Sequence, residues 1–244
     1  MAVIRPFRAI RPTPELAGKV AALPYDVMSS DEAREMVQDN PYSFLHVDKA
    51  EIYLDRDIDL YDQRVYEQAR DNLQSMIETG VLQQEKQACL YVYRQIMEGR
   101  AQTGIVACAS IDDYLNNIIK KHELTRADKE LDRTRHVEYC DANTGPIFLT
   151  YPARTEINAI VAEQVAKPPL YDISFDDGIR HLVWMIDDPN AIRHLVELFA
   201  SVEYLYIADG HHRSASAVRV GQLRRQAQPD YSGAEEFNYF LTVI

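Results

Sequence analysis

The residues best suited to chemistry lie late in the chain, where a β-type segment gives way to a helical one. Asp209-Gly210-His211-His212-Arg213 directly follows the apolar run Tyr204–Ala208. Glycine permits a left-handed backbone, and a helix N-terminus offers free N–H groups and a partial positive charge. Because the two histidines and the arginine add side-chain donors, this pattern predicts a phosphate site. Asp209 at its rim is placed to hold a magnesium ion or to orient a histidine.

A second group of polar residues follows another short β-type run. Its cations surround a single carboxylate, Glu123, which can accept a proton from an attacking hydroxyl. The cations and histidine assigned to substrate or phosphate binding are Lys121, His122, Arg126 and Arg133. The alternative for this group is a solvated turn of mixed charge. For the first group, the alternative is that Arg213 pairs with a nearby carboxylate while the histidines cap a helix.

Other motifs narrow the choice of chemistry. The GxxxxGK[ST] spacing of a P-loop is absent, as are the HxH and HExxH spacings of common metal sites. A metal-dependent hydrolase with Asp209, His211 and His212 as ligands is therefore a weaker alternative. The proline-flanked segments Pro24–Val27 and Asn40–Val47 suit either a rigid loop that lines a pocket or a loop held to the core by tyrosines.

The helices and strands that position these groups are predicted from the spacing of apolar residues and from residues that begin or end such elements. Apolar spacing and capping signals predict helices over 29–38, 60–79, 125–140 and 155–166, another from 188, and one after Arg213. Strands are expected over 88–97 and 102–109 as a hairpin, and over 118–123, 145–151, 171–175, 178–186, 204–208 and 239–244. Residues 112–117 are expected to form a short polar connection. The apolar end of the sequence is typical of a truncated chain.

Composition limits the class of protein. The chain has 244 residues, 46% of them hydrophobic and 26% charged, which is ordinary for a soluble globular protein and excludes wholesale disorder. A net charge of −12 counts against a nucleic-acid or anionic membrane surface. Neither a membrane-length apolar run nor a signal-peptide core is present. The 3 cysteines lack CxxC spacing, so we expect reduced thiols and a cytoplasmic location.

Several blocks of the sequence resemble known families. The order of Lys120–Glu123, Gly145–Tyr151 and Asp209–Arg213 resembles the ParB/sulfiredoxin-like superfamily, and most of all its archaeal-type free serine kinases. The whole chain also resembles a widespread bacterial family of unknown function, through Pro24–Val27, Asn40–Val47, Lys121–Arg126 and Ala208–Ala217. The likeness to the kinases covers only 118–151 and 204–225, so it leaves about fifty intervening residues unmatched.

The resemblance to kinases implies a function and a fold. Glu123 would be the catalytic glutamate, Asp209 would lie near the metal or substrate, and Gly210, His211, His212 and Arg213 would hold nucleotide phosphates. The expected fold is α/β, or α+β, with an N-terminal α+β part over 1–110. A ParB/sulfiredoxin-like unit would cover 111–244, interrupted by an insertion at about 152–203.

We therefore expect a kinase that uses ATP or ADP with Mg²⁺ to phosphorylate the hydroxyl of a small metabolite, with free serine implied by resemblance only. The rival is a nucleotide-sensing module that binds ATP, ADP or CTP without phosphoryl transfer. Sulfiredoxin chemistry is not implied, because the loop carries histidine and glycine where that chemistry needs cysteine. A DNA-binding role is disfavoured by the negative charge and by the absence of a helix-turn-helix pattern.

Overall fold

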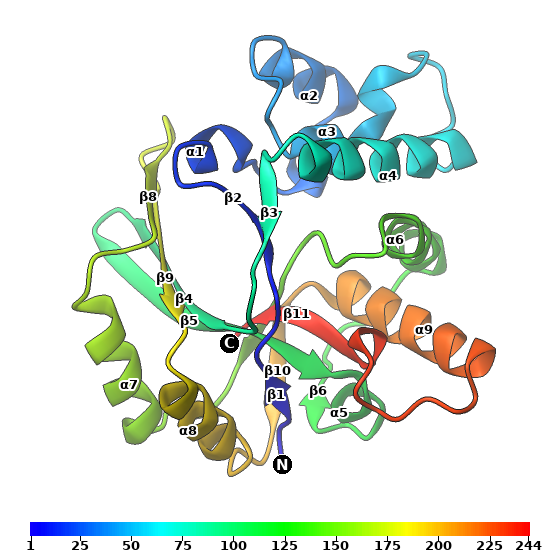
Figure 1. Ribbon diagram of the computed structural model, residues 1–244. Coiled ribbons are helices and arrows are strands. Elements are labelled where there is room, and N and C mark those ends of the chain that lie inside the picture. Colours follow the sequence, from blue (N-terminus) through cyan, green and yellow to red (C-terminus); the bar gives the residue numbers. More distant parts are fainter.

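The computed structural model describes residues 1–244 as a mixed α/β fold around one large sheet (Figure 1). The expected α/β class is confirmed. The strands are β1 (Ile4–Arg5), β2 (Ile10–Pro12), β3 (Leu82–Gln84), β4 (Leu90–Met97), β5 (Arg100–Ser110), β6 (Ile119–Lys120), β7 (Ile147–Thr150), β8 (Tyr171–Ser174), β9 (Arg180–Ile186), β10 (Leu205–Asp209) and β11 (Tyr239–Val243). The helices are α1 (Ala17–Val20), α2 (Ser30–Val37), α3 (Leu45–Asp48), α4 (Gln63–Glu78), α5 (Ile111–Leu115), α6 (Ala127–Cys140), α7 (Thr155–Val165), α8 (Pro189–Phe199) and α9 (His211–Ala227). Short 3₁₀ turns cover Tyr25–Val27, Ala50–Tyr53 and Glu236–Asn238.

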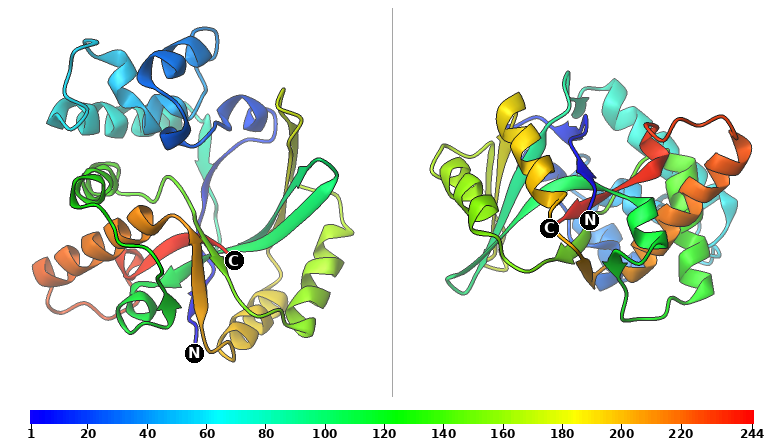
Figure 2. Two further views of the ribbon diagram at one scale, coloured as in Figure 1. Left: turned by 180° about the vertical axis from the view of Figure 1, so that it is seen from behind. Right: turned by 90° about the horizontal axis from the view of Figure 1, so that it is seen from below.

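The main sheet has the strand order β6-β10-β7-β11-β5-β4-β9-β8, with β1 paired to β5 beside this path. Strands β2 and β3 form a separate two-stranded ribbon. Helix α7 packs against β4 and β9, and α8 packs against α7 and β1 (Figures 1 and 2). On the other half of the sheet, α9 packs against β7 and β11 with α5 beside it, and α6 covers α9. None of the helices is both long and apolar enough to span a bilayer.

Local sequence signals account for several elements. Helix α2 begins with the expected capping box, in which the Ser29 and Glu32 side chains bond each other's backbone N–H groups. Helix α4 buries the predicted apolar stripe, including Val65, Ala69 and Leu73, and ends just before Gly80 at φ 78°. Both helices therefore form where periodicity and caps indicate them.

The predicted hairpin is present, with a tighter turn than expected. Glu98 and Gly99 have φ values of 51° and 78°, so the two-residue turn matches the strand twist and β5 begins already at Arg100. The expectation of a polar connection over 112–117 is wrong, because the Ser110 hydroxyl accepts the Asp112 N–H and opens α5.

Two apolar clusters hold the chain together. The larger lies at the main sheet and includes Trp184, Phe199 and Phe240, whereas the smaller joins α3 and α4 to Cys140 of α6. The sheet crosses the expected boundary at residue 110, because β5 pairs with β11 and β4 pairs with β9. Strand β9, from the expected insertion at 152–203, is therefore part of the same sheet.

Close packing at Gly221 gives a test of this arrangement. A Cβ there would lie 2.5 Å from the Phe237 carbonyl oxygen and 2.6 Å from Ile111 Cδ1. We expect Gly221→Ala to lower the free energy of unfolding by about 1–3 kcal/mol through overpacking, measured by urea denaturation. Gly18→Ala in α1 is the control, because its nearest neighbour is 3.8 Å away. Equal effects of the two substitutions would contradict the close approach of α9 to Phe237.

Candidate active site

Two loops that are distant in sequence meet where β6 and β10 end. The strands pair in parallel, with Ile119 opposite Leu205 and Lys120 opposite Tyr206. Parallel neighbours end at the same edge of a sheet, which is where ligands bind in open α/β sheets. The loop that begins at Lys121 therefore lies beside the turn that joins β10 to α9.

The turn after β10 presents an uncapped helix N-terminus. Gly210 has a φ of 90° and occupies the N-cap position of α9, and no side chain caps the helix. An added Cβ would be strained there and would lie 3.3 Å from Arg213 Nε. The first N–H groups of this 17-residue helix are thus left to an external acceptor, at the positive end of the helix dipole.

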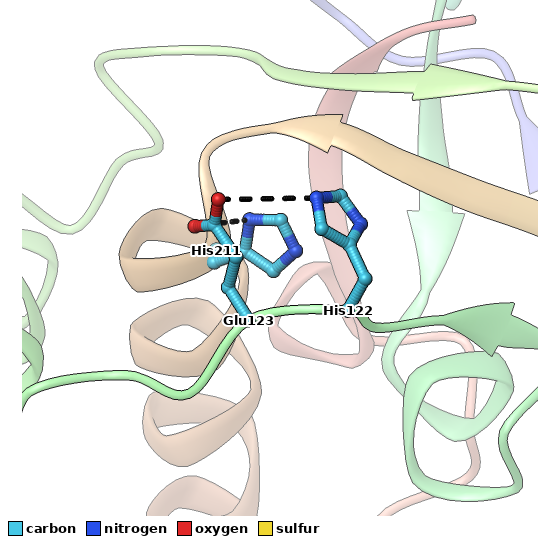
Figure 3. A group of neighbouring side chains, drawn as sticks. All are labelled: His122, Glu123 and His211. Atoms are coloured by element: carbon cyan, nitrogen blue, oxygen red, sulfur yellow. Dashed lines mark ion pairs between the residues drawn. The ribbon is translucent and has the colours of Figure 1, made fainter.

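Three of the predicted site residues come together at this edge (Figure 3). Glu123 Oε2 lies 3.3 Å from His211 Nδ1, and Glu123 Oε1 lies 3.8 Å from His122 Nε2. The two imidazole rings meet edge to face, with their centroids 4.5 Å apart. The Glu123 carboxylate, His122 and His211 form what we call the His–Glu–His cluster. One ligand atom from each lies within 4.8 Å of the others, so the cluster can hold a metal ion.

His211 is the buried member of the cluster. Its side chain is 5% exposed, whereas those of His122 and Glu123 are largely exposed. Burial lowers the pKa of His211 by disfavouring the charged imidazolium, and the Glu123 carboxylate opposes that shift. His211 Nε2 is buried without a hydrogen-bond partner. A buried polar atom left unpaired costs free energy, and the ring nitrogen that faces the Glu123 carboxylate is Nδ1.

Arg213 is held by the protein itself. Its Nη2 donates to Asp209 Oδ2 at 2.6 Å, and its Nη1 donates to the Pro146 carbonyl oxygen at 2.6 Å. These contacts fasten the end of β10 to the loop before β7. The sequence suggested, as an alternative to phosphate binding, that Arg213 pairs with a nearby carboxylate. Its contact with Asp209 is such a pair. Asp209, the predicted metal ligand, already shares its carboxylate with Arg213.

The remaining predicted residues have partners of their own. His212 Nε2 accepts the Arg126 backbone N–H at 3.1 Å, which ties the start of α6 to α9. The Arg126 side chain pairs with Asp128 at 2.7 Å. Lys121 Nζ donates to the Tyr114 carbonyl oxygen at 3.2 Å and lies over the ring of the same residue. Lys121 and Arg126 therefore flank the cluster with their charges directed to neighbours.

Arg133 lies in a separate pocket, between the N-terminal helices, α6 and the loop before β7. The polar residues that line it are Tyr25, Asp48, Arg133, His136, Asn143, Thr144 and Arg213. Tyr25 belongs to a loop that the sequence left open between a pocket and a core role. Asp48, His136 and Thr144 were missed, because nothing in their local sequence indicates that they share a cavity with Arg133.

The comparisons with known proteins identify a family without a described activity. A family model for a protein of unknown function, DUF1015, matches residues 4–244. The chain belongs to the DUF1015 family. No curated protein and no solved structure matches it. The resemblance of the whole chain to a family of unknown function is therefore confirmed, whereas no match supports the likeness to ParB, sulfiredoxin or serine kinases.

The pocket of this DUF1015 protein holds opposing buried charges. Burial raises the pKa of Asp48 to about 6, although the nearby Arg133 charge acts to lower it. Burial and the same arginine lower the pKa of His136 to about 4. The ionised Asp48 side chain, 15% exposed, is therefore destabilising in the folded state at neutral pH.

Replacement of Asp48 tests this electrostatic account. Because the folded-state pKa is above the usual 3.8, folding favours the protonated acid, and stability falls as pH rises from about 4 through about 6. Asp48→Asn should therefore unfold with a free energy about 2–3 kcal/mol higher than the parent at pH 7. The gain should disappear below about pH 4, as measured by denaturant unfolding across this range. Exposed Asp57→Asn is the control, and a gain that does not depend on pH would contradict the assignment.

Proposed function

We propose that this protein is a nucleotide-dependent kinase that phosphorylates the hydroxyl of a small metabolite. The observation that carries the proposal is the position of the Glu123 carboxylate 3.3 Å from His211, the first residue of an uncapped helix. A base and a phosphate-binding helix end are two of the parts that phosphoryl transfer to an alcohol uses.

Different residues of the chain would have different roles in phosphoryl transfer. Glu123 accepts the proton of the acceptor hydroxyl, whose oxygen forms a bond to the terminal phosphorus while the bond from that phosphorus to the bridging oxygen of the nucleotide breaks. The free N–H groups at Gly210 to Arg213 stabilise the charge on the phosphoryl oxygens. When bound, ATP or ADP supplies the phosphoryl group and Mg²⁺ offsets its charge. The exposed Asp209 carboxylate is the residue that would hold this ion.

The motif resemblance to archaeal-type free serine kinases, which no comparison supports, would give Glu123 the role of their catalytic glutamate and Asp209–Arg213 that of their phosphate turn. It also makes free serine or a similar hydroxylated metabolite the first acceptor to test. The alternative is a nucleotide-sensing module, in which the same turn holds ATP, ADP or CTP and no phosphoryl group moves.

Glu123→Gln separates catalysis from binding. We expect it to lower phosphoryl transfer at least about 100-fold, because glutamine cannot accept the proton, with nucleotide affinity changed less than about threefold. The assay incubates the protein with labelled ATP or ADP and hydroxylated metabolites, and calorimetry gives the nucleotide affinity. Exposed Glu163→Gln on α7 is the control. Loss of binding together with activity would contradict the role of general base, and nucleotide binding with no transfer to any acceptor would favour the sensor.

A second candidate function follows from the His–Glu–His cluster: a metal-dependent hydrolase. Two imidazoles and one carboxylate are the donor set of many catalytic zinc sites, with a position left open for water. Ligands about 2.0–2.2 Å from a tetrahedral ion lie about 3.3–3.6 Å apart. The contact of Glu123 Oε2 with His211 is 3.3 Å and that of Oε1 with His122 is 3.8 Å, and one ligand atom from each residue lies within 4.8 Å of the others. This set differs from the one that the sequence suggested, which combined Asp209, His211 and His212.

Zinc titration decides between the two candidates. If the cluster is a metal centre, chelator-treated protein should bind one Zn²⁺, and His122→Ala should weaken that binding at least about tenfold by removing a ligand. His194→Ala, which changes an exposed histidine on α8, should leave binding unchanged. Zinc binding that is weak and insensitive to His122→Ala would eliminate the hydrolase and leave Glu123 free to act as the base.

A further inference from the structure

The pocket around Arg133 brings together segments that are far apart in the chain. Tyr25 comes from the first 3₁₀ turn, Asp48 from the end of α3, Arg133 from α6, and Thr144 from the loop before β7. The walls are thus formed where the N-terminal helices meet α6 and the start of β7. Neither the His–Glu–His cluster nor the proposed phosphate turn accounts for these residues.

Arg133 is fixed in place with part of its hydrogen-bonding capacity free. Its side chain is 13% exposed, and its guanidinium carbon lies 4.1 Å from the centre of the Tyr25 ring. The only hydrogen bond that it donates within the protein runs from Nε to Asp132 Oδ2, at 2.9 Å. The aromatic ring and Asp132 therefore set the plane of the guanidinium, and both terminal nitrogens are left for a planar anion.

Asp48 offers the complementary group. Its Oδ1 is buried and has no hydrogen-bond partner. The His136 Nε2 atom lies 3.8 Å away, and Arg133 forms its salt bridge with Asp132 instead. A carboxylate and a guanidinium thus line one pocket without pairing to each other. The Asp48 carboxylate has a hydrogen bond with the Thr144 side chain, but its Oδ1 lacks a donor, and the two terminal nitrogens of Arg133 lack an acceptor. A ligand that carries both an anion and a donor would supply these two missing partners.

We infer that the Tyr25–Asp48–Arg133 pocket is the acceptor subsite, and that it binds a small molecule carrying a carboxylate or phosphate next to a hydrogen-bond donor. The anion binds Arg133, and the donor, an ammonium or a hydroxyl, binds Asp48 Oδ1. The role as acceptor subsite rests on the proposed kinase function, whereas the binding chemistry does not. Arg213 lines this pocket and also braces the turn at Gly210, so the subsite borders the proposed phosphate turn.

Matched probes test the recognition chemistry on the full chain by calorimetry, without nucleotide. L-alanine carries carboxylate and ammonium, L-lactate carboxylate and hydroxyl, O-phosphoethanolamine phosphate and ammonium, and propionate carboxylate alone. We expect at least one of the first three to bind at least about tenfold more tightly than propionate, because only those three satisfy Asp48. The preferred probe identifies both the anion and the donor. Propionate binding as tightly as all three, or no binding by any of the three, overturns the inference.

Two variants assign the effect to the pocket. Asp48→Asn should weaken the preferred probe at least about tenfold without weakening propionate, because a neutral side chain removes a repulsion of the carboxylate. Arg133→Lys should weaken all of the probes. Because Asp48→Asn is expected to be the more stable protein, lost binding cannot be ascribed to unfolding. Arg180→Lys, on the distant β8–β9 hairpin, is the control. Wild-type affinity in Asp48→Asn overturns the inference.

These experiments distinguish failure of the acceptor subsite from failure of the proposed kinase function. Probe binding that depends on Asp48, in a protein that transfers no phosphoryl group, keeps the recognition site and rejects the reaction. Phosphoryl transfer that depends on Glu123, with an unchanged acceptor KM in Asp48→Asn and Arg133→Lys, keeps the reaction and rejects the subsite.

Discussion

The parallel pairing of β6 with β10 is the constraint on which the candidate site depends. Strand β6 has only two residues, and it is held by Ile119, fully buried opposite Leu205, and by the Leu205 N–H, which donates to the Ile118 carbonyl oxygen. So short an edge strand supplies few hydrogen bonds. The contact of His212 with the Arg126 backbone is therefore a needed second attachment, because it fixes the far end of the loop that carries Glu123. The loop is thus anchored on both sides of its carboxylate.

The charges in the Arg133 pocket differ from other buried charges in the same chain. Lys49, the neighbour of Asp48 in sequence, forms a 2.8 Å salt bridge with Glu51, and both side chains are almost fully buried. The fold can therefore pair a buried charge within a few residues of this position. Asp48 forms no salt bridge with a lysine or arginine although Arg133 lines the same pocket, and its Oδ1 has no hydrogen-bond donor, so burial of this carboxylate lowers stability. Residues that are kept at a cost in stability tend to be those that function requires, which is why this pocket supports an inference about ligands.

The parts of the structure that the sequence predicted are those governed by local interactions. The capping box at Ser29, the apolar stripe of α4 and the turn at Gly99 each depend on residues within one element, so spacing alone indicates them. The contact between Glu123 and His211 depends on strand pairing across more than eighty residues, and periodicity contains no information about such pairing. Arg133 was predicted as a binding residue, but the pocket that it shares with Asp48 was inaccessible to sequence analysis for the same reason. In contrast, the Asp209–Arg213 pair joins the end of β10 to the first turn of α9 across only four residues, so it is a local contact of the kind that the sequence suggested.

Arg213 links the two sites that the structure suggests. One guanidinium nitrogen holds Asp209 at the end of β10, the other holds the Pro146 carbonyl oxygen, and the side chain packs against the left-handed Gly210 while lining the Arg133 pocket. A ligand in that pocket would therefore meet the side chain that braces the phosphate turn. A side chain at Gly210 would crowd the guanidinium and strain the backbone, so the glycine allows both the Arg213 contacts and the left-handed helix start. For a reaction that joins two ligands, a single rigid residue in contact with both positions is a direct way to hold their separation constant.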